Sequence, residues 1–193
     1  MGSHEELVEL CERMWQGERP IDTYREVGRL FEVTPDVALV LGFGNVAAVR
    51  TQDGLVLADT SQAAHITPIL ASLRAWDASR VDTVVYTHAH FDHAGGAAAI
   101  DDEAARRFDP PVRVVAHENV AGRFQRYRET AGYQAVINAR QFRSRTGSGS
   151  ARAWTTWREP DLTFAKGIDL TIGGMPVQRS VGAGLLGWGS ARG

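Results

Sequence analysis

Residues 86–96 read YTHAHFDHAGG and contain four side chains of metal-binding type, His88, His90, Asp92 and His93. Zinc and similar metals favour imidazole nitrogen together with carboxylate oxygen. In an extended segment, residues two apart point to the same side, so His88 and His90 can converge on one ion. Asp92 and His93 follow in the loop and can turn towards a second ion. This density and order of ligand types indicates a metal site rather than a set of surface polar residues.

The flanking residues are those expected of a loop between a strand and a helix. The segment RVDTVVYT, 80–87, is a short apolar strand, and GGAAAIDDEAARRF, 95–108, is rich in helix-forming alanine. In open α/β sheets, ligands bind beyond the carboxyl ends of strands. Gly95 and Gly96 permit a tight turn into the helix. We therefore expect the histidine loop to lie at a sheet edge.

The rest of the chain alternates between strand and helix patterns. Apolar segments within 37–59 predict a meander of two or three strands, and 66–76 predicts a helix. A strand at 111–116 and a long helix over 118–142 follow. This alternation predicts an α/β architecture with helices packed on a sheet.

The two ends differ from the central part. Residues 1–32 form a predicted N-terminal helical extension, in which Cys11 falls on an apolar face and is expected to be buried. Residues 33–174 form the predicted domain, with a polar linker near 143–152 and a strand pair near 154–174. Residues 175–193 are rich in glycine and show neither helical nor strand periodicity, so we expect an irregular tail.

Composition excludes several classes of protein. The net charge of −2 gives no basic surface for nucleic acid. No apolar run approaches the ~18 residues of a membrane span, and no signal-peptide pattern is present. A single cysteine excludes an internal disulfide. These features favour a cytoplasmic protein.

The sequence THAHFDHAGG resembles the H-x-H-x-D-H signature of the metallo-β-lactamase-fold hydrolases. GNVAAVRTQDGLVLADT is similar to the family's N-terminal strands, which lead to an aspartate, here Asp59. The family often has glycine two residues later, where this chain has Ser61. YRETAGYQAVINARQF resembles the alkyl-sulfatase-like branch. The resemblance implies an αββα sandwich whose N-terminal half is well represented and whose C-terminal half is incomplete.

The resemblance also implies roles for the ligand residues. His88 and His90 would bind a first metal, Asp92 and His93 a second, and Asp59 would orient ligands by hydrogen bonding. The implied cofactor is one or two zinc ions, or other divalent metals, which make hydroxide available for attack on an ester-like bond. Asp92 would also act in catalysis by positioning the nucleophile or moving a proton.

Members of the family complete their metals with ligands from later in the chain, and such ligands are not recognisable here. No histidine follows His117, and the later acids lie in no ligand motif: Glu118, Glu129, Glu159, Asp161 and Asp169. A truncated, catalytically silent fragment or binding remnant is therefore the alternative, with an oligomer or partner covering the exposed faces. A flavodiiron-type domain is less favoured, because His90 stands where that branch has glutamate.

The remaining notable residues have structural interpretations. We expect Trp154 and Trp157 to pack on strands, and three arginines to form a solvated helix face: Arg123, Arg126 and Arg128. His117 fits either a loop edge or the mouth of the site. No role is predicted for His65.

Overall fold

A computed structural model of the chain describes residues 1–20, 26–142 and 151–180. The N-terminal part contains α1 (His4–Trp15), β1 (Leu30–Thr34), β2 (Val37–Val40), β3 (Val46–Thr51), β4 (Gly54–Ala58), α2 (Ile66–Trp76) and β5 (Val81–Val85). The remainder contains α3 (Phe91–Ala94), α4 (Ala97–Arg107), β6 (Arg113–His117), α5 (Asn119–Glu129), α6 (Ala131–Phe142), η1 (Ala151–Trp154), β7 (Leu162–Phe164), β8 (Gly167–Ile172) and β9 (Met175–Ser180).

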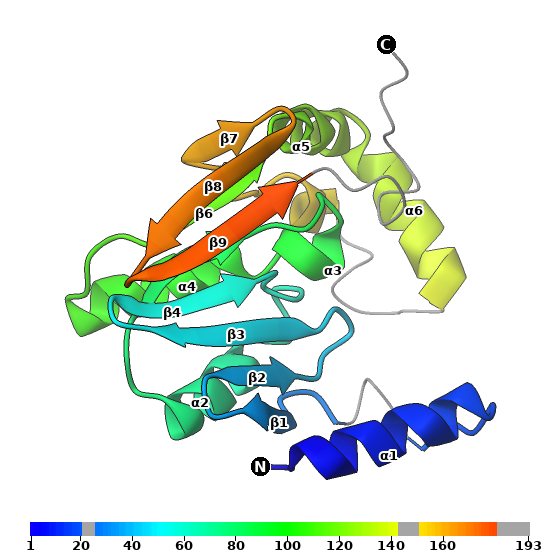
Figure 1. The fold of residues 1–193 in the computed structure, drawn as a ribbon. Coiled ribbons are helices and arrows are strands. Elements are labelled where there is room, and N and C mark those ends of the chain that lie inside the picture. The colour runs from blue at the N-terminus through cyan, green and yellow to red at the C-terminus, as the bar shows by residue number, and fades with distance from the viewer. Residues whose placement is uncertain (21–25, 143–150, 181–193) are drawn as a thin grey trace.

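Seven strands form one sheet in the order β1 to β7 (Figure 1). The strands from β1 to β4 pair antiparallel, as the predicted meander requires, and those from β4 to β7 pair parallel. The meander also includes β1, which lies before the segment predicted to be extended. The α/β fold class is confirmed. Among the described residues, no helix is both long and apolar enough to cross a membrane.

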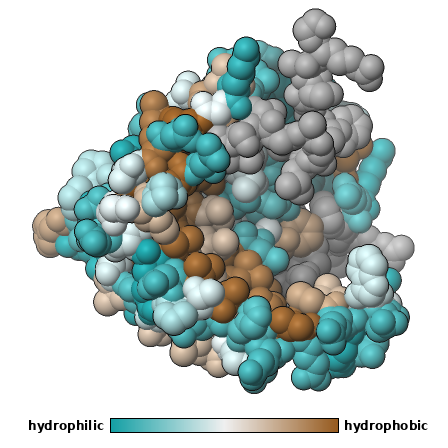
Figure 2. Space-filling view, in the orientation of Figure 1, coloured by the Kyte–Doolittle hydropathy of each residue, from teal (hydrophilic) through white to brown (hydrophobic). Residues whose placement is uncertain are grey.

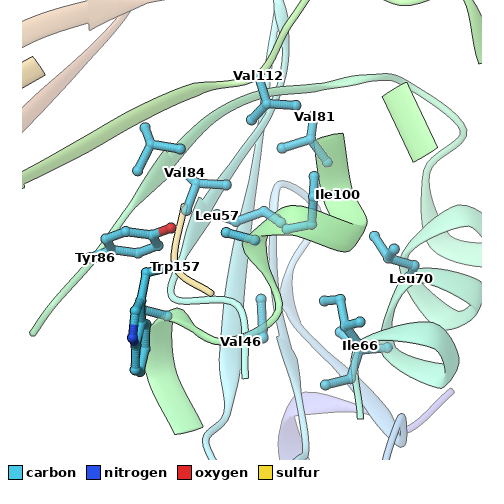
Figure 3. Packing of buried hydrophobic residues seen from close by; sticks show 14 of the residues in the cluster. Val46, Leu57, Ile66, Leu70, Val81, Val84, Tyr86, Ile100, Val112 and Trp157 are labelled. Atoms are coloured by element: carbon cyan, nitrogen blue, oxygen red, sulfur yellow. The ribbon is translucent and has the colours of Figure 1, made fainter. Parts of the chain in front are cut away.

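The two faces of the sheet are covered by different elements. Alternate strand residues such as Leu57 and Val84 are buried in a cluster that also contains Ile66 of α2 and Ile100 of α4 (Figure 3). Their neighbours Val56, Val85 and Val115 belong to a second cluster with Phe164 and Ile172. Parallel strands need cover on both faces, and here helices supply one side and the β8–β9 hairpin the other.

The second face is only partly covered. Half-buried apolar residues lie beside the second cluster: Val49, Leu162, Ile168, Leu170 and Val177. Figure 2 shows hydrophobic surface running across this view of the molecule between hydrophilic margins. The β8–β9 hairpin is anchored to the β3–β4 turn, where Gly173 N–H donates to Asp53 at 2.7 Å.

Four expectations from the sequence are corrected. The long helix over 118–142 is two helices that meet at Thr130, whose N–H still bonds to the carbonyl of Arg126. Residues 175–180, expected to be irregular, form β9, while 181–193 lie outside the described residues. Cys11 is exposed rather than buried. The strands expected to pair with each other near 154–174 do not do so, because β7 pairs with β6 and β8 pairs with β9.

The register of the β8–β9 hairpin explains why β9 forms. Ile172 pairs with Met175, which leaves Gly173 and Gly174 as a two-residue turn. Both glycines have positive φ, 52° and 78°, as the tight turns of twisted hairpins require. The Gly-Gly pair therefore indicates a hairpin turn, even though the residues after it alternate only weakly between apolar and polar.

Candidate metal centre

The residues 87–96, here called the ligand loop, leave the carboxyl end of β5 beside the end of β4. The parallel register pairs Ala58 with Val85, so Asp59 and the ligand loop emerge at the same sheet edge. The loop's middle folds into the single turn of α3, in which the N–H groups of His93 and Ala94 bond to the carbonyl of His90. The predicted position of the histidine cluster at a sheet edge is what the structure shows.

Asp59 is the buried centre of the hydrogen bonds that hold this loop. The residue is 5% exposed, and its carboxylate accepts bonds of 2.7 Å from both the N–H and the hydroxyl of Thr87. The carboxylate oxygen that faces the Thr87 hydroxyl also lies 2.7 Å from Nδ1 of His93. This arrangement fixes the His93 ring and directs its Nε2 away from Asp59.

The imidazole rings gather into one cluster. The centroids of His88 and His93 lie 4.0 Å apart, and those of His88 and His90 lie 4.5 Å apart. Nδ1 of His88 is 3.0 Å from the Thr87 hydroxyl, which leaves its Nε2 available. Potential ligand atoms of Asp59, His88 and His93 all lie within 4.8 Å of one another. Three donors of metal-binding type therefore converge.

His90 and Asp92 complete the set of predicted residues around this cluster. The His90 side chain is exposed, and its ring packs edge-on against His88. Asp92 is half-buried, with a carboxylate oxygen 3.3 Å from Nε2 of His93. The structure thus brings all five predicted residues to one place, although the convergent triad includes Asp59 rather than His90 or Asp92.

The charges of the cluster favour a cation beside the carboxylates. Burial alone would lower the pKa of His93, but hydrogen bonds to Asp59 and Asp92 outweigh it and raise that pKa to about 9. Burial, together with the neighbouring imidazoles, lowers the pKa of His88 to about 4. Burial alone would raise the pKa of Asp92, but the hydrogen bond with His93 lowers it, and the net shift of this pKa is downward.

The backbone around the ligand loop leaves little room for movement. A Cβ at Gly44, in the β2–β3 loop, would overlap the carbonyl oxygen of Asp92, and one at Gly96 would overlap that of Thr60. Thr60 N–H also donates to the carbonyl of His93 at 2.7 Å. The segments before and after β4 therefore enclose the loop, and glycine is required where the backbones touch.

Two residues beside the loop adopt backbone conformations that are unfavourable for non-glycine residues. Asp59 has φ 64° and Ser61 has φ 56°, both in the left-handed region. The hydroxyl of Ser61 is buried and has no hydrogen-bond partner among the described residues. Strain of this kind persists only where surrounding contacts enforce it, and here the enforcing contacts are those of the ligand loop.

An aromatic cluster that sequence reasoning missed supports the loop from the side. Phe91, between His90 and Asp92, has its ring 5.1 Å from that of Trp154 and 5.9 Å from that of Trp157. Trp157 in turn stacks on Phe124 of α5 at 4.5 Å. The helical spacing of Phe124 and Tyr127 on α5 was the available signal, but the distant tryptophans could not be paired with it from the sequence.

His65 and His117 serve local structure. His117 accepts a bond from Asn119 N–H through Nδ1 and has Nε2 2.8 Å from the carbonyl of Ala165, so both ring nitrogens are engaged. This places it at a loop edge. His65 precedes α2, and its Nδ1 accepts a long bond of 3.4 Å from Phe43 N–H.

The donor set fits a divalent metal of the zinc type. Two imidazole nitrogens and a neighbouring carboxylate are the ligand chemistry that zinc favours. A ligating histidine commonly donates its second N–H to a carboxylate, as His93 is placed to do with Asp59. An α/β sheet that presents such a cluster beyond its parallel strands defines a metallohydrolase-like centre.

The comparisons with known proteins agree with this class. A sequence model of the metallo-beta-lactamase superfamily matches residues 39–175, and the chain belongs to that family of hydrolases, whose members bind divalent metals, typically zinc. The predicted recognition and the metallo-β-lactamase-like fold are thereby confirmed.

Individual relatives cover different shares of the molecule. The chain is 37% identical over 82 residues to an (R)-specific secondary-alkylsulfatase of Pseudomonas sp, which is 40% of this chain and 12% of that protein. A class B3 di-zinc metallo-beta-lactamase from an Alaskan soil metagenome is 16% identical, with a TM-score of 0.55 over 81% of this chain and 53% of the other. A subclass B3 metallo-beta-lactamase of Bradyrhizobium japonicum is 21% identical, with a TM-score of 0.53 over 79% and 52%.

Proposed function

We propose that this chain binds zinc, or a similar divalent metal, and hydrolyses an ester-like bond in a small molecule. The observation that carries the proposal is the convergence of Asp59, His88 and His93 beyond the parallel strands. Family membership supports hydrolysis as the reaction. The alkylsulfatase relative makes sulfate esters the first substrate class to test.

The roles of the ligand residues follow from the ring nitrogens that Thr87 and Asp59 leave available. Nε2 of His88 and Nε2 of His93 would hold the metal, with His90 and Asp92 beside them, while Asp59 keeps the His93 ring in place. When bound, such a metal supplies Lewis acidity and makes hydroxide available near neutral pH. The protein's own contribution is to fix the ligand loop through Asp59, Gly44 and Phe91.

Asp92 is placed for a second role in the reaction. Its lowered pKa keeps the carboxylate ionised near neutral pH, where it can accept a hydrogen bond from a nucleophile and hold it in position. Its half-buried side chain borders the histidine rings. We therefore propose Asp92 both as a metal ligand and as the residue that orients the attacking group.

Metal analysis of the purified chain tests this proposal. We expect one or two zinc ions per chain, lost in a His88→Ala, His90→Ala double variant, and zinc-dependent release of sulfate from secondary alkyl sulfates. His4→Ala is the matched control, because His4 is exposed at the start of α1. Wild-type protein that takes up no stoichiometric zinc would refute the metal-binding part of the proposal.

A binding remnant without turnover is the second candidate, and one observation favours it. Three of the downstream acids in the described region are engaged elsewhere: Glu159 pairs with Arg128, Asp161 with Arg158, and Asp169 accepts a bond from Gln178. Within the described ranges, neither the triad nor its neighbours includes a ligand later than His93. Stoichiometric zinc with no hydrolysis of any ester tested would favour this candidate.

A further inference from the structure

The aromatic cluster connects the ligand loop to a cation on α5. Phe91 and Tyr127 both pack against Trp154, with ring centroids 5.1 Å and 5.3 Å from it. Tyr127 also stacks on Trp157 at 5.2 Å with planes 19° apart. Tyr127 is buried and therefore keeps a fixed position relative to Phe91. Any group that rests on Tyr127 is thereby placed relative to the ligand loop.

The guanidinium of Arg123 is that group. Its Cζ lies 4.8 Å from the centroid of the Tyr127 ring, a cation–π contact across one helical turn. Phe124, the next residue of α5, stacks on Trp157, whose ring lies 5.9 Å from that of Phe91 in the ligand loop. The expectation that Arg123 belongs to a solvated helix face is therefore incomplete, because this residue is half-buried and lies over the Tyr127 ring.

The charge of Arg123 is not neutralised by an acid within the described part of the chain. Arg128, on the same helix, pairs with Glu159 at 2.5 Å, and Arg158 pairs with Asp101 and Asp161. No described carboxylate forms such a pair with Arg123. A planar guanidinium that is held by an aromatic ring and lacks a carboxylate partner retains its donors for a ligand.

We propose that Arg123 recognises an oxyanion group of the substrate, of the sulfate or phosphate ester type, beside the ligand loop. The guanidinium fork matches two oxygens of such a group, and charge-assisted bonds of this kind are strong and directional. This inference rests on the proposed function, which it deepens by assigning the substrate's charge. Arg123 would select anionic over neutral esters.

Binding of inorganic sulfate to the full chain tests the inference without turnover. Calorimetric titrations with sodium sulfate, against sodium chloride at equal ionic strength, are made on metal-free and zinc-loaded protein. We expect Arg123→Gln to weaken sulfate binding by about tenfold or more, as the loss of charge-assisted bonds implies. We expect Arg123→Lys to retain part of the affinity. Parallel titrations with phosphate show which oxyanion the site prefers.

Arg126→Gln is the matched control, since Arg126 is exposed on the same helix. Urea unfolding of each variant establishes that it folds. If Arg123→Gln does not fold, the comparison of Arg123→Lys with the wild type tests the inference. Wild-type protein that binds neither anion in either form, or an equal loss in Arg126→Gln, would overturn the inference. Failure to bind zinc would instead overturn the proposed function, because anion binding is also measured without metal.

Discussion

Nδ1 of His93 lies 2.7 Å from the carboxylate of Asp59, and this contact joins the end of β4 to the ligand loop. The same carboxylate holds the Thr87 backbone and hydroxyl. One buried acid therefore sets both the start of the loop and the orientation of a ligand ring within it.

Replacing Asp59 with asparagine should weaken zinc binding. The amide oxygen can still accept from Thr87 N–H, but the amide brings no charge and its NH₂ group cannot accept a hydrogen bond from His93. We expect the zinc dissociation constant to rise by about 10- to 100-fold, the usual effect of removing such a partner. Competition with a chromophoric chelator measures it.

Asp102→Asn is the control for this change, because Asp102 is exposed on α4. Equal zinc affinity for wild type, Asp59→Asn and Asp102→Asn would show that the Asp59–His93 contact does not act on the metal.

Replacing Gly44 with alanine should displace the ligand loop. The added Cβ would overlap the carbonyl oxygen of Asp92, and neither backbone can move freely. Overpacking of this kind costs about 1–3 kcal/mol in the free energy of unfolding. We expect that loss in urea denaturation together with weaker zinc binding.

Gly132→Ala provides a matched comparison on α6, where an added Cβ would meet no atom within 4 Å. Because alanine favours helix over glycine, this variant should gain about 0.5–1 kcal/mol and bind zinc as the wild type does. A Gly44→Ala protein as stable as Gly132→Ala would contradict the close contact with Asp92.

Replacing Ser61 with glycine should stabilise the protein. Glycine adopts the positive φ of this position without strain, and the change removes a fully buried hydroxyl that lacks a partner. Greater freedom of glycine in the unfolded chain offsets part of the gain. We expect a net increase of about 1 kcal/mol in the free energy of unfolding, and thermal unfolding of the metal-free protein checks its sign.

Asp161 should make the free energy of unfolding depend on pH in the acid range. Burial raises its pKa, but bonds from Arg158 and from the backbone N–H of Val114 outweigh this effect and lower it. A lowered folded-state pKa contributes stability above the ordinary aspartate pKa, and this contribution is lost as the pH falls through the folded value. The stability difference between wild type and Asp161→Asn should therefore hold above about pH 5 and shrink as the pH falls from there through the folded-state pKa, which lies below the ordinary aspartate value. A difference that stays constant over this range would contradict the assignment.

The position of the metal centre was accessible from sequence because its signals are local. His88 to His93 follow an apolar strand and precede a helix, and each pattern lies within about ten residues of the others. Asp59 came from the resemblance alone, since nothing near it identifies its partner. Only the parallel pairing of β4 with β5 brings it to Thr87 and His93.

The missed features depend on contacts between distant segments. Phe91 meets Trp154 across 63 positions of sequence, and both are ordinary apolar residues in their own neighbourhoods. In the sequence, Arg123 does not differ from the other arginines of α5. It is distinguished by its contact with Tyr127, which itself packs against Trp154 of η1. Tertiary packing determines these contacts, and the periodicity of the sequence does not predict which distant segments pack together.

The mixed pairing of β4 also has a consequence for the order of folding. Its antiparallel contact with β3 closes over a short turn, so this hairpin can form early. Its parallel contact with β5 must wait for the crossover through α2, because the longer loop costs more entropy before its contacts form. Asp59 and His93, 34 positions apart, therefore meet late in folding, and zinc would report on a nearly native chain rather than act as a template for its collapse.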